Sequence, residues 1–131
     1  MVGADASAVL DLWEEAMSAP LPKRALAMLA YGYPDARPSD LGALPLGMRD
    51  ALLVQLRRRL FGNGLSFVTT CPVCGVLVES SLDLSTMSFD APNAGVAELQ
   101  LPGGRIRVRA PTAADLLNLP SDAESARRAL V

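Results

Sequence analysis

Residues 47–84 read GMRDALLVQLRRRLFGNGLSFVTTCPVCGVLVESSLDL, and this stretch decides the fold. Its first part predicts a helix over residues 47–61, because leucines recur at helical spacing and Gly62 stands where a helix commonly ends. We expect four of these leucines to be buried: Leu52, Leu53, Leu56 and Leu60. After Gly64 the apolar period changes to two, which is typical of a β-strand.

Three consecutive arginines, Arg57, Arg58 and Arg59, lie in the last turns of the predicted helix. Positive charge at this end opposes the negative pole of the helix dipole and contributes about 0.3–1 kcal/mol per residue. An anion-binding or partner-docking role is the alternative. The net charge of −2 favours the structural role.

A CPxCG knuckle, Cys71-Pro72-Val73-Cys74-Gly75, lies between two strand-like segments, so we place it at the tip of a β-hairpin. Two thiolates in one tight turn can reach the same metal, and Gly75 can adopt the positive φ that such a turn requires. Structural zinc takes four protein ligands, whereas the chain holds only two cysteines and no histidine. Cys71 and Cys74 therefore predict half of a zinc site, which binds zinc only if another CxxC pair completes it.

Two other interpretations of the cysteine pair stay open. A thioredoxin-type redox pair normally opens a helix, whose dipole lowers the pKa of the attacking thiol, whereas β-like sequence flanks this pair on both sides. The pair can also be a relic knuckle that keeps the turn geometry with free thiols and no metal.

The sequence before residue 47 predicts two helices and a connector. Ser7 can cap the first helix, and Pro20 ends it. Its apolar stripe consists of Val9, Leu10, Trp13, Ala16 and Met17, which favours core packing of Trp13 over an interface role. A second helix is expected over residues 23–30. Glycines and prolines in residues 31–45 predict a connector without regular structure.

The sequence after residue 95 predicts a second hairpin and a helical end. Leu99 and Leu101 are separated from Ile106 and Val108 by Pro102-Gly103-Gly104, and three arginines alternate on the opposite face: Arg105, Arg107 and Arg109. Thr112 and Asp115 resemble a capping pair for a helix near Ala113. Pro120 interrupts this helix, and Ser121-Asp122-Ala123-Glu124 can start another.

The expected fold class is therefore α+β. It comprises N-terminal helices, a small antiparallel β-hairpin region with a zinc-ribbon-like knuckle, and a C-terminal helix. We expect one compact domain overall, divided into a helical region (residues 1–62), a hairpin and knuckle region (residues 63–110) and a C-terminal helical segment (residues 111–131).

Composition argues against several classes of function. A net charge of −2 gives little attraction for nucleic acid, and the apolar runs are too short for a membrane span. The first ten residues lack the basic start and apolar stretch of a signal peptide, so we expect a cytosolic product. Without histidine the chain lacks the commonest general base, and its carboxylates are scattered. We therefore expect a protein that is not an enzyme.

The order of these motifs resembles a family of contractile tails. Residues 10–34 read LDLWEEAMSAPLPKRALAMLAYGYP. Further along, a helix begins with Leu44-Pro45-Leu46-Gly47-x-Arg49-Asp50 and ends with Leu56-Arg57 and Phe61-Gly62. The knuckle follows this helix. This pattern, with Trp13-Glu14 and Arg24-Ala25-Leu26, is similar to the phage T4-like baseplate proteins and their relatives in extracellular contractile injection systems. The resemblance covers about residues 8–130.

The resemblance implies a non-enzymatic structural or assembly component associated with the baseplate of a contractile tail. Its partners would be other baseplate or tail proteins, or a second copy of itself, with no nucleic acid. It would be cytoplasmic during assembly, and the resemblance does not say which baseplate neighbour it touches or whether it stays in the finished particle. Longer members carry a second CPxCG-like pair near their end, which this chain lacks. A zinc-ribbon-like adaptor in regulation is the alternative function.

Overall fold

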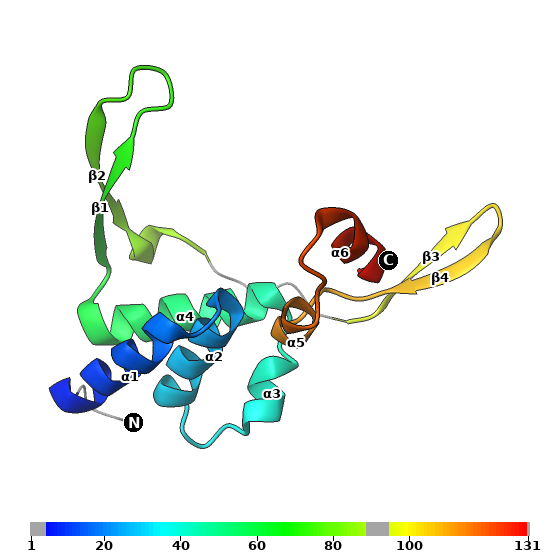
Figure 1. The fold of residues 1–131 in the computed structure, drawn as a ribbon, viewed down its shortest axis with the longest axis horizontal. Helices are drawn as coiled ribbons and strands as arrows, with labels where there is room; N and C mark the ends of the chain where they lie inside the picture. Colours follow the sequence, from blue (N-terminus) through cyan, green and yellow to red (C-terminus); the bar gives the residue numbers. More distant parts are fainter. Residues whose placement is uncertain (1–4, 89–94, 131) are drawn as a thin grey trace.

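The computed structural model describes residues 5–88 and 95–130, and it has the predicted α+β class. Four helices come first along the described chain, two separate antiparallel hairpins follow, and two short helices come last (Figure 1). In chain order, the elements are α1 (Ala6–Ser18), α2 (Leu21–Gly32), α3 (Pro38–Gly42), α4 (Leu46–Phe61), β1 (Gly64–Thr70), β2 (Leu77–Asp83), the 3-10 helix η1 (Leu84–Thr86), β3 (Ala97–Leu101), β4 (Gly104–Val108), α5 (Ala113–Leu117) and α6 (Ala123–Ala129). No helix in residues 5–88 and 95–130 is long and apolar enough to cross a membrane.

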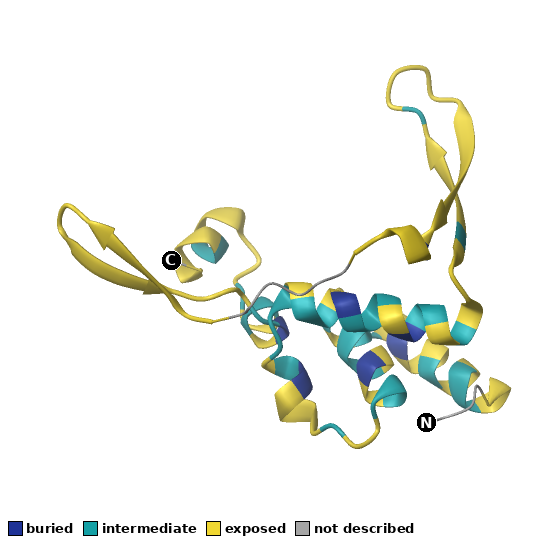
Figure 2. Cartoon of the chain, turned by 180° about the vertical axis from the view of Figure 1, so that it is seen from behind, coloured by how far each residue is buried: buried dark blue, intermediate teal, exposed yellow. Residues whose placement is uncertain are grey.

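The hydrophobic core is small and lies where α2 meets its neighbours. Helix α2 contacts α1, α3, α4 and α5, and its Leu29 is 0% exposed. The other buried apolar residues of the described chain are Ala16, Leu41, Ala51, Leu56, Leu84 and Ala113. Nearly all of them lie on the packed helices (Figure 2). These helices form one helical body, to which the C-terminal region contributes α5.

The first two helices begin earlier than the sequence patterns predict. Asp5, and not Ser7, caps α1, because the Asp5 carboxylate accepts a hydrogen bond from the Ser7 backbone N–H at 3.2 Å. Helix α2 begins at Leu21, with Pro22 in its first turn, where a missing N–H costs nothing.

The predicted connector contains a short helix, α3, so the prediction of no regular structure there is wrong. Pro38 occupies its first turn, a position that tolerates proline because the N–H has no partner inside the helix. Leu41 of this helix is buried in the core.

Helix α4 matches its prediction closely, but only part of its leucine stripe is buried. Leu56 is buried, whereas Leu52, Leu53 and Leu60 are half-buried, so the expectation of four buried leucines is wrong for three of them. Gly62 ends the helix with a φ of 77°.

The three arginines of α4 have local structural contacts. Arg57 donates to the carbonyl oxygens of Gly62 and Gly64, both at 2.6 Å. Arg58 donates to the Asn63 side chain at 2.8 Å, and the Arg59 guanidinium lies 5.5 Å from the ring centre of Tyr33. The contacts of Arg57 and Arg58 fix the turn that leads from the helix into β1, whereas Arg59 reaches Tyr33 at the end of α2.

Both hairpins project from the helical body in different directions (Figure 1). In the first hairpin Leu65 pairs with Leu82 and Phe67 with Ser80, and in the second Leu99 pairs with Ile106. Every residue of β2, β3 and β4 is exposed. The hairpins therefore stand outside the core, and their strands pack chiefly against each other.

The chain returns from the second hairpin to the helical body through a short backbone contact. The Leu46 N–H donates to the Pro111 carbonyl at 2.9 Å, and Pro45 forms an isolated antiparallel bridge with Thr112. This contact joins the first turn of α4 to the start of α5.

Candidate metal centre

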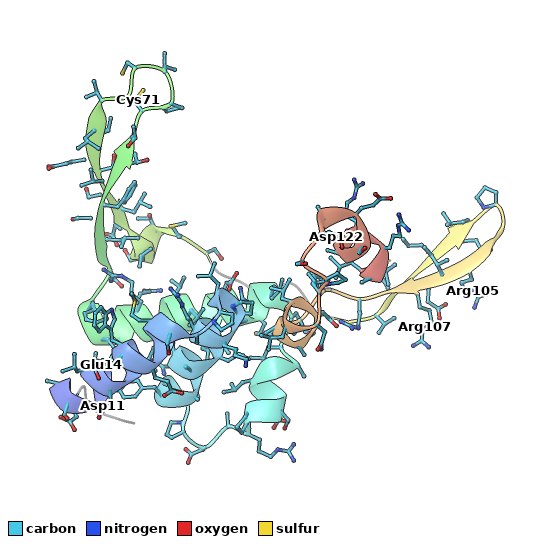
Figure 3. All side chains as sticks on the ribbon, in the orientation of Figure 1. Asp11, Glu14, Cys71, Arg105, Arg107 and Asp122 are labelled. Atoms are coloured by element: carbon cyan, nitrogen blue, oxygen red, sulfur yellow. The ribbon has the colours of Figure 1, made fainter. Side chains whose placement is uncertain are left out.

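The knuckle forms the tip of the first hairpin, as the sequence predicts. Cys71 follows the last residue of β1, and its N–H donates to the Val76 carbonyl at 2.9 Å. The Gly75 N–H donates back to the Cys71 carbonyl at 2.9 Å, and Gly75 has a φ of 73°. These two bonds close the turn at the outer end of the hairpin, where Figure 3 labels Cys71.

Both thiols are free, and they differ in exposure. Cys71 is half-buried and Cys74 is exposed. The pKa of the Cys71 thiol lies below its ordinary value, because the backbone N–H groups of Cys74 and then Val73 donate to its sulfur, with a further contribution from the Cys74 side chain. The turn therefore favours a thiolate at Cys71, the form that ligates metals.

The knuckle supplies two ligands and no more. Within the part of the chain that the structure describes, no group of three or more histidine, cysteine, aspartate or glutamate side chains is placed to hold a metal ion. Glu79, on the returning strand, lies opposite Val68 in the register and belongs to no such group. The turn thus offers two thiols, and the half of a zinc site that the sequence predicts stays a prediction.

The surface around the knuckle is apolar and uncharged. Residues 64–78 contain no aspartate, glutamate, lysine or arginine. Val73, in the middle of the turn, is 93% exposed, and Val76 and Leu77 are exposed beside it. An exposed apolar group of this kind is typical of a contact surface.

The second hairpin is amphipathic. Leu99, Leu101, Ile106 and Val108 share one face, and all four are exposed. On the opposite face Glu98 forms ion pairs with Arg105 at 3.5 Å and Arg107 at 3.9 Å. The structure thus confirms the predicted alternation, but it leaves the apolar face uncovered.

Trp13 lies outside the core, so the prediction of core packing is wrong. It is 58% exposed, because α1 turns Ala16 and the half-buried Leu12 toward the other helices. The Trp13 side chain instead lines an open, mostly apolar groove between α1 and the end of α4, formed by Ala6, Val9, Leu10, Trp13, Leu60 and Phe61.

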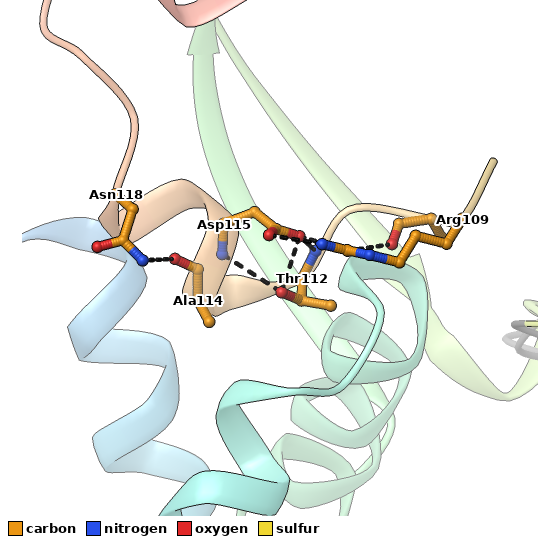
Figure 4. A network of polar contacts seen from close by, with 6 residues as sticks. Arg109, Thr112, Ala114, Asp115 and Asn118 are labelled. Carbon is orange, nitrogen blue, oxygen red and sulfur yellow. Dashed lines mark hydrogen bonds and ion pairs between the residues drawn. The ribbon is translucent and has the colours of Figure 1, made fainter. Parts of the chain in front are cut away.

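A polar network at the start of α5 joins the second hairpin to the helical body (Figure 4). Thr112 and Asp115 form the predicted capping box, with the Thr112 N–H donating to the Asp115 carboxylate at 2.8 Å. Arg109 lies beyond β4 and donates to both oxygens of that carboxylate, at 2.6 and 2.8 Å. These bonds, of which the one from Arg109 contributes most, hold the pKa of Asp115 well below its usual range. Sequence reasoning placed Arg109 on the hairpin face and missed this pairing.

Comparisons of the chain with protein-family models, with curated proteins and with solved structures found no match.

Proposed function

We propose that this chain is a non-enzymatic structural or assembly component that acts through protein–protein contacts. The observation that carries the proposal is the pair of hairpins whose apolar faces are uncovered. A two-stranded hairpin alone in water is marginally stable at best, so such elements gain most of their stability when another surface covers them.

The second hairpin gives the sharpest form of this argument. Its apolar face consists of four exposed side chains, whereas its opposite face is charged and suited to water. The four side chains are each 40–48% exposed, so covering them would contribute roughly half of the 1.5–3 kcal/mol per side chain that complete burial gives. The contrast between its apolar and its charged face supports a hairpin whose apolar face lies on another protein.

The resemblance to T4-like baseplate proteins supports a particular setting for these contacts. In that setting the partners are other baseplate or tail proteins of a contractile injection particle. The protein acts in the cytoplasm during assembly, either as a structural part of the particle or as an assembly factor.

A zinc-ribbon-like adaptor in regulation is the second candidate, and the knuckle at the hairpin tip favours it. The net charge of −2 weighs against nucleic acid as its partner. The two candidates differ in the partner, because an adaptor would bind a regulatory protein and not tail components.

The test is co-expression of the full chain with the tube, sheath, spike and baseplate proteins encoded near it, followed by affinity capture. We expect a tail or baseplate protein to be captured, and the Leu99→Ser, Ile106→Ser double variant to lose it. Gln100→Ser, on the opposite face of the same strand, is the matched control and should retain the partner. Equal capture by the double variant, or capture of none of these proteins, would contradict the proposal.

A further inference from the structure

We propose that the first hairpins of two copies of this chain meet tip to tip and share one zinc ion, held by Cys71 and Cys74 of each copy. The inference rests on the proposed function in one respect, namely that the first hairpin is a contact element. It goes beyond that function by naming the ligand and the occupant of the tip.

The position of the knuckle makes such a meeting sterically simple. Strand β1 has seven residues, and at about 3.3 Å per residue it carries the tip on the order of 20 Å from the end of α4. The tip is the part of this hairpin farthest from the helical body (Figure 1). Two copies can therefore bring their knuckles together while their helical bodies stay apart.

The number of ligands requires a second contributor. Cys71 and Cys74 lie in one closed turn, and the described residues offer no group of three or more metal-binding side chains. Tetrahedral structural zinc takes four ligands. A two-fold pairing supplies the same two thiolates from each copy, which completes a set of four sulfurs with no other residue type.

The surface of the tip is suited to contact with the same surface of a second copy. Two like copies that carry a charged tip would repel each other, but residues 64–78 contain no aspartate, glutamate, lysine or arginine, and zinc would neutralise thiolates at the cysteines. Three exposed apolar side chains lie in and beside the knuckle: Val73, Val76 and Leu77. Meeting tip to tip would cover these apolar side chains of both copies and shield the zinc site from water. The apolar contact therefore strengthens zinc binding, and zinc strengthens the contact.

The experiment titrates zinc into the full chain under reducing conditions while light scattering follows the mass. We expect one zinc per two chains, with the mass rising from 13.8 kDa to twice that value and returning when a chelator removes the metal. Cobalt in place of zinc should give the intense charge-transfer absorption of four thiolates. Cys71→Ser and Cys74→Ser should each abolish the zinc-dependent doubling, whereas Ser66→Ala, on the same hairpin away from the tip, should not.

Three results would overturn the inference: tight binding of one zinc by the monomeric chain, a dimer that forms equally without metal, or zinc binding only after a different cysteine-bearing protein is added. The helical circular dichroism of each variant establishes that it is folded. Affinity capture of tail proteins by the unaltered chain, run beside its zinc titration, separates this inference from the proposed function. If tail proteins are captured but zinc does not bridge two copies, the zinc bridge is wrong and the contact function stands. If zinc bridges two copies but no tail protein is captured, the zinc bridge stands and the proposed tail partners are wrong.

Discussion

Gly32 at the end of α2 packs directly on Leu56 of α4, so closely that a β-carbon added to Gly32 would lie 2.7 Å from Leu56 Cδ1 and 3.2 Å from its Cγ. Leu56 is itself buried and cannot swing away without disturbing the core. The absence of a side chain at Gly32 is what allows these two helices to approach.

Gly32→Ala should therefore destabilise the protein. Overpacking of a core contact typically costs about 1–3 kcal/mol, which outweighs the roughly 0.5–1 kcal/mol that alanine gains over glycine in a helix. Urea unfolding followed by circular dichroism measures the change. Gly42→Ala is the matched control, since Gly42 also ends a helix but nothing lies within 4 Å of an added β-carbon. A variant at Gly32 as stable as the control would contradict the close contact.

Leu56→Ala should lower the free energy of unfolding by about 2–5 kcal/mol, because it removes a buried side chain and leaves a cavity. Gln55→Ala, on the exposed side of the same helix, should change it by less than about 0.5 kcal/mol. Similar losses for both variants in urea unfolding would mean that α4 does not face a core at Leu56.

The Asp115 carboxylate should make the free energy of unfolding of the protein decrease at low pH. Its pKa is lower in the folded chain than the value near 3.9 of an unfolded aspartate, so its contribution is present above that value and is lost as the pH falls further. The difference in thermal stability between the protein and Asp115→Asn should be constant from neutral pH to about pH 4 and should shrink steadily as the pH falls below that value. A difference that stays constant from pH 7 to pH 3 would show that the carboxylate contributes no charged interaction.

The chain should have no disulfide oxidoreductase activity. The cysteines lie at the tip of a hairpin and not at the start of a helix, so no helix dipole activates either thiol. Insulin reduction in the presence of a thiol reductant is the assay, with Cys74→Ser as the control. Turnover that depends on Cys74 would favour the redox interpretation of the pair.

Local sequence signals predict most of the secondary structure but less of the packing. The period of the leucines and the stop at Gly62 predict α4 to within a residue of its start, and period-two alternation predicts both hairpins. Helix α3 was missed because Pro38 was interpreted as a breaker, although proline suits the first turn of a helix. The apolar stripe of α1 is wide enough for either side to face the core, so the exposure of Trp13 could not be predicted from it.

The candidate site shows the same limit. The Cys71–Gly75 pattern predicts a knuckle at a hairpin tip, because the spacing and the glycine are properties of the turn itself. Any further ligands for a metal would have to come from outside the turn, and no local signal encodes them. The pairing of Arg109 with Asp115 was missed for a related reason, since it depends on how the chain leaves β4 and reaches α5.

Amide hydrogen exchange of the metal-free full chain tests most directly whether the helices alone form the stable core while the hairpins depend on a partner. The backbone amides of α2 and α4 should exchange slowly, at rates set by global unfolding, because these helices surround Leu29 and Leu56. The amides of β1 to β4 should exchange orders of magnitude faster and should slow only when a partner covers the hairpins. Hairpin amides that exchange as slowly as those of α4 in the isolated, metal-free chain would contradict this assignment of core and contact surface.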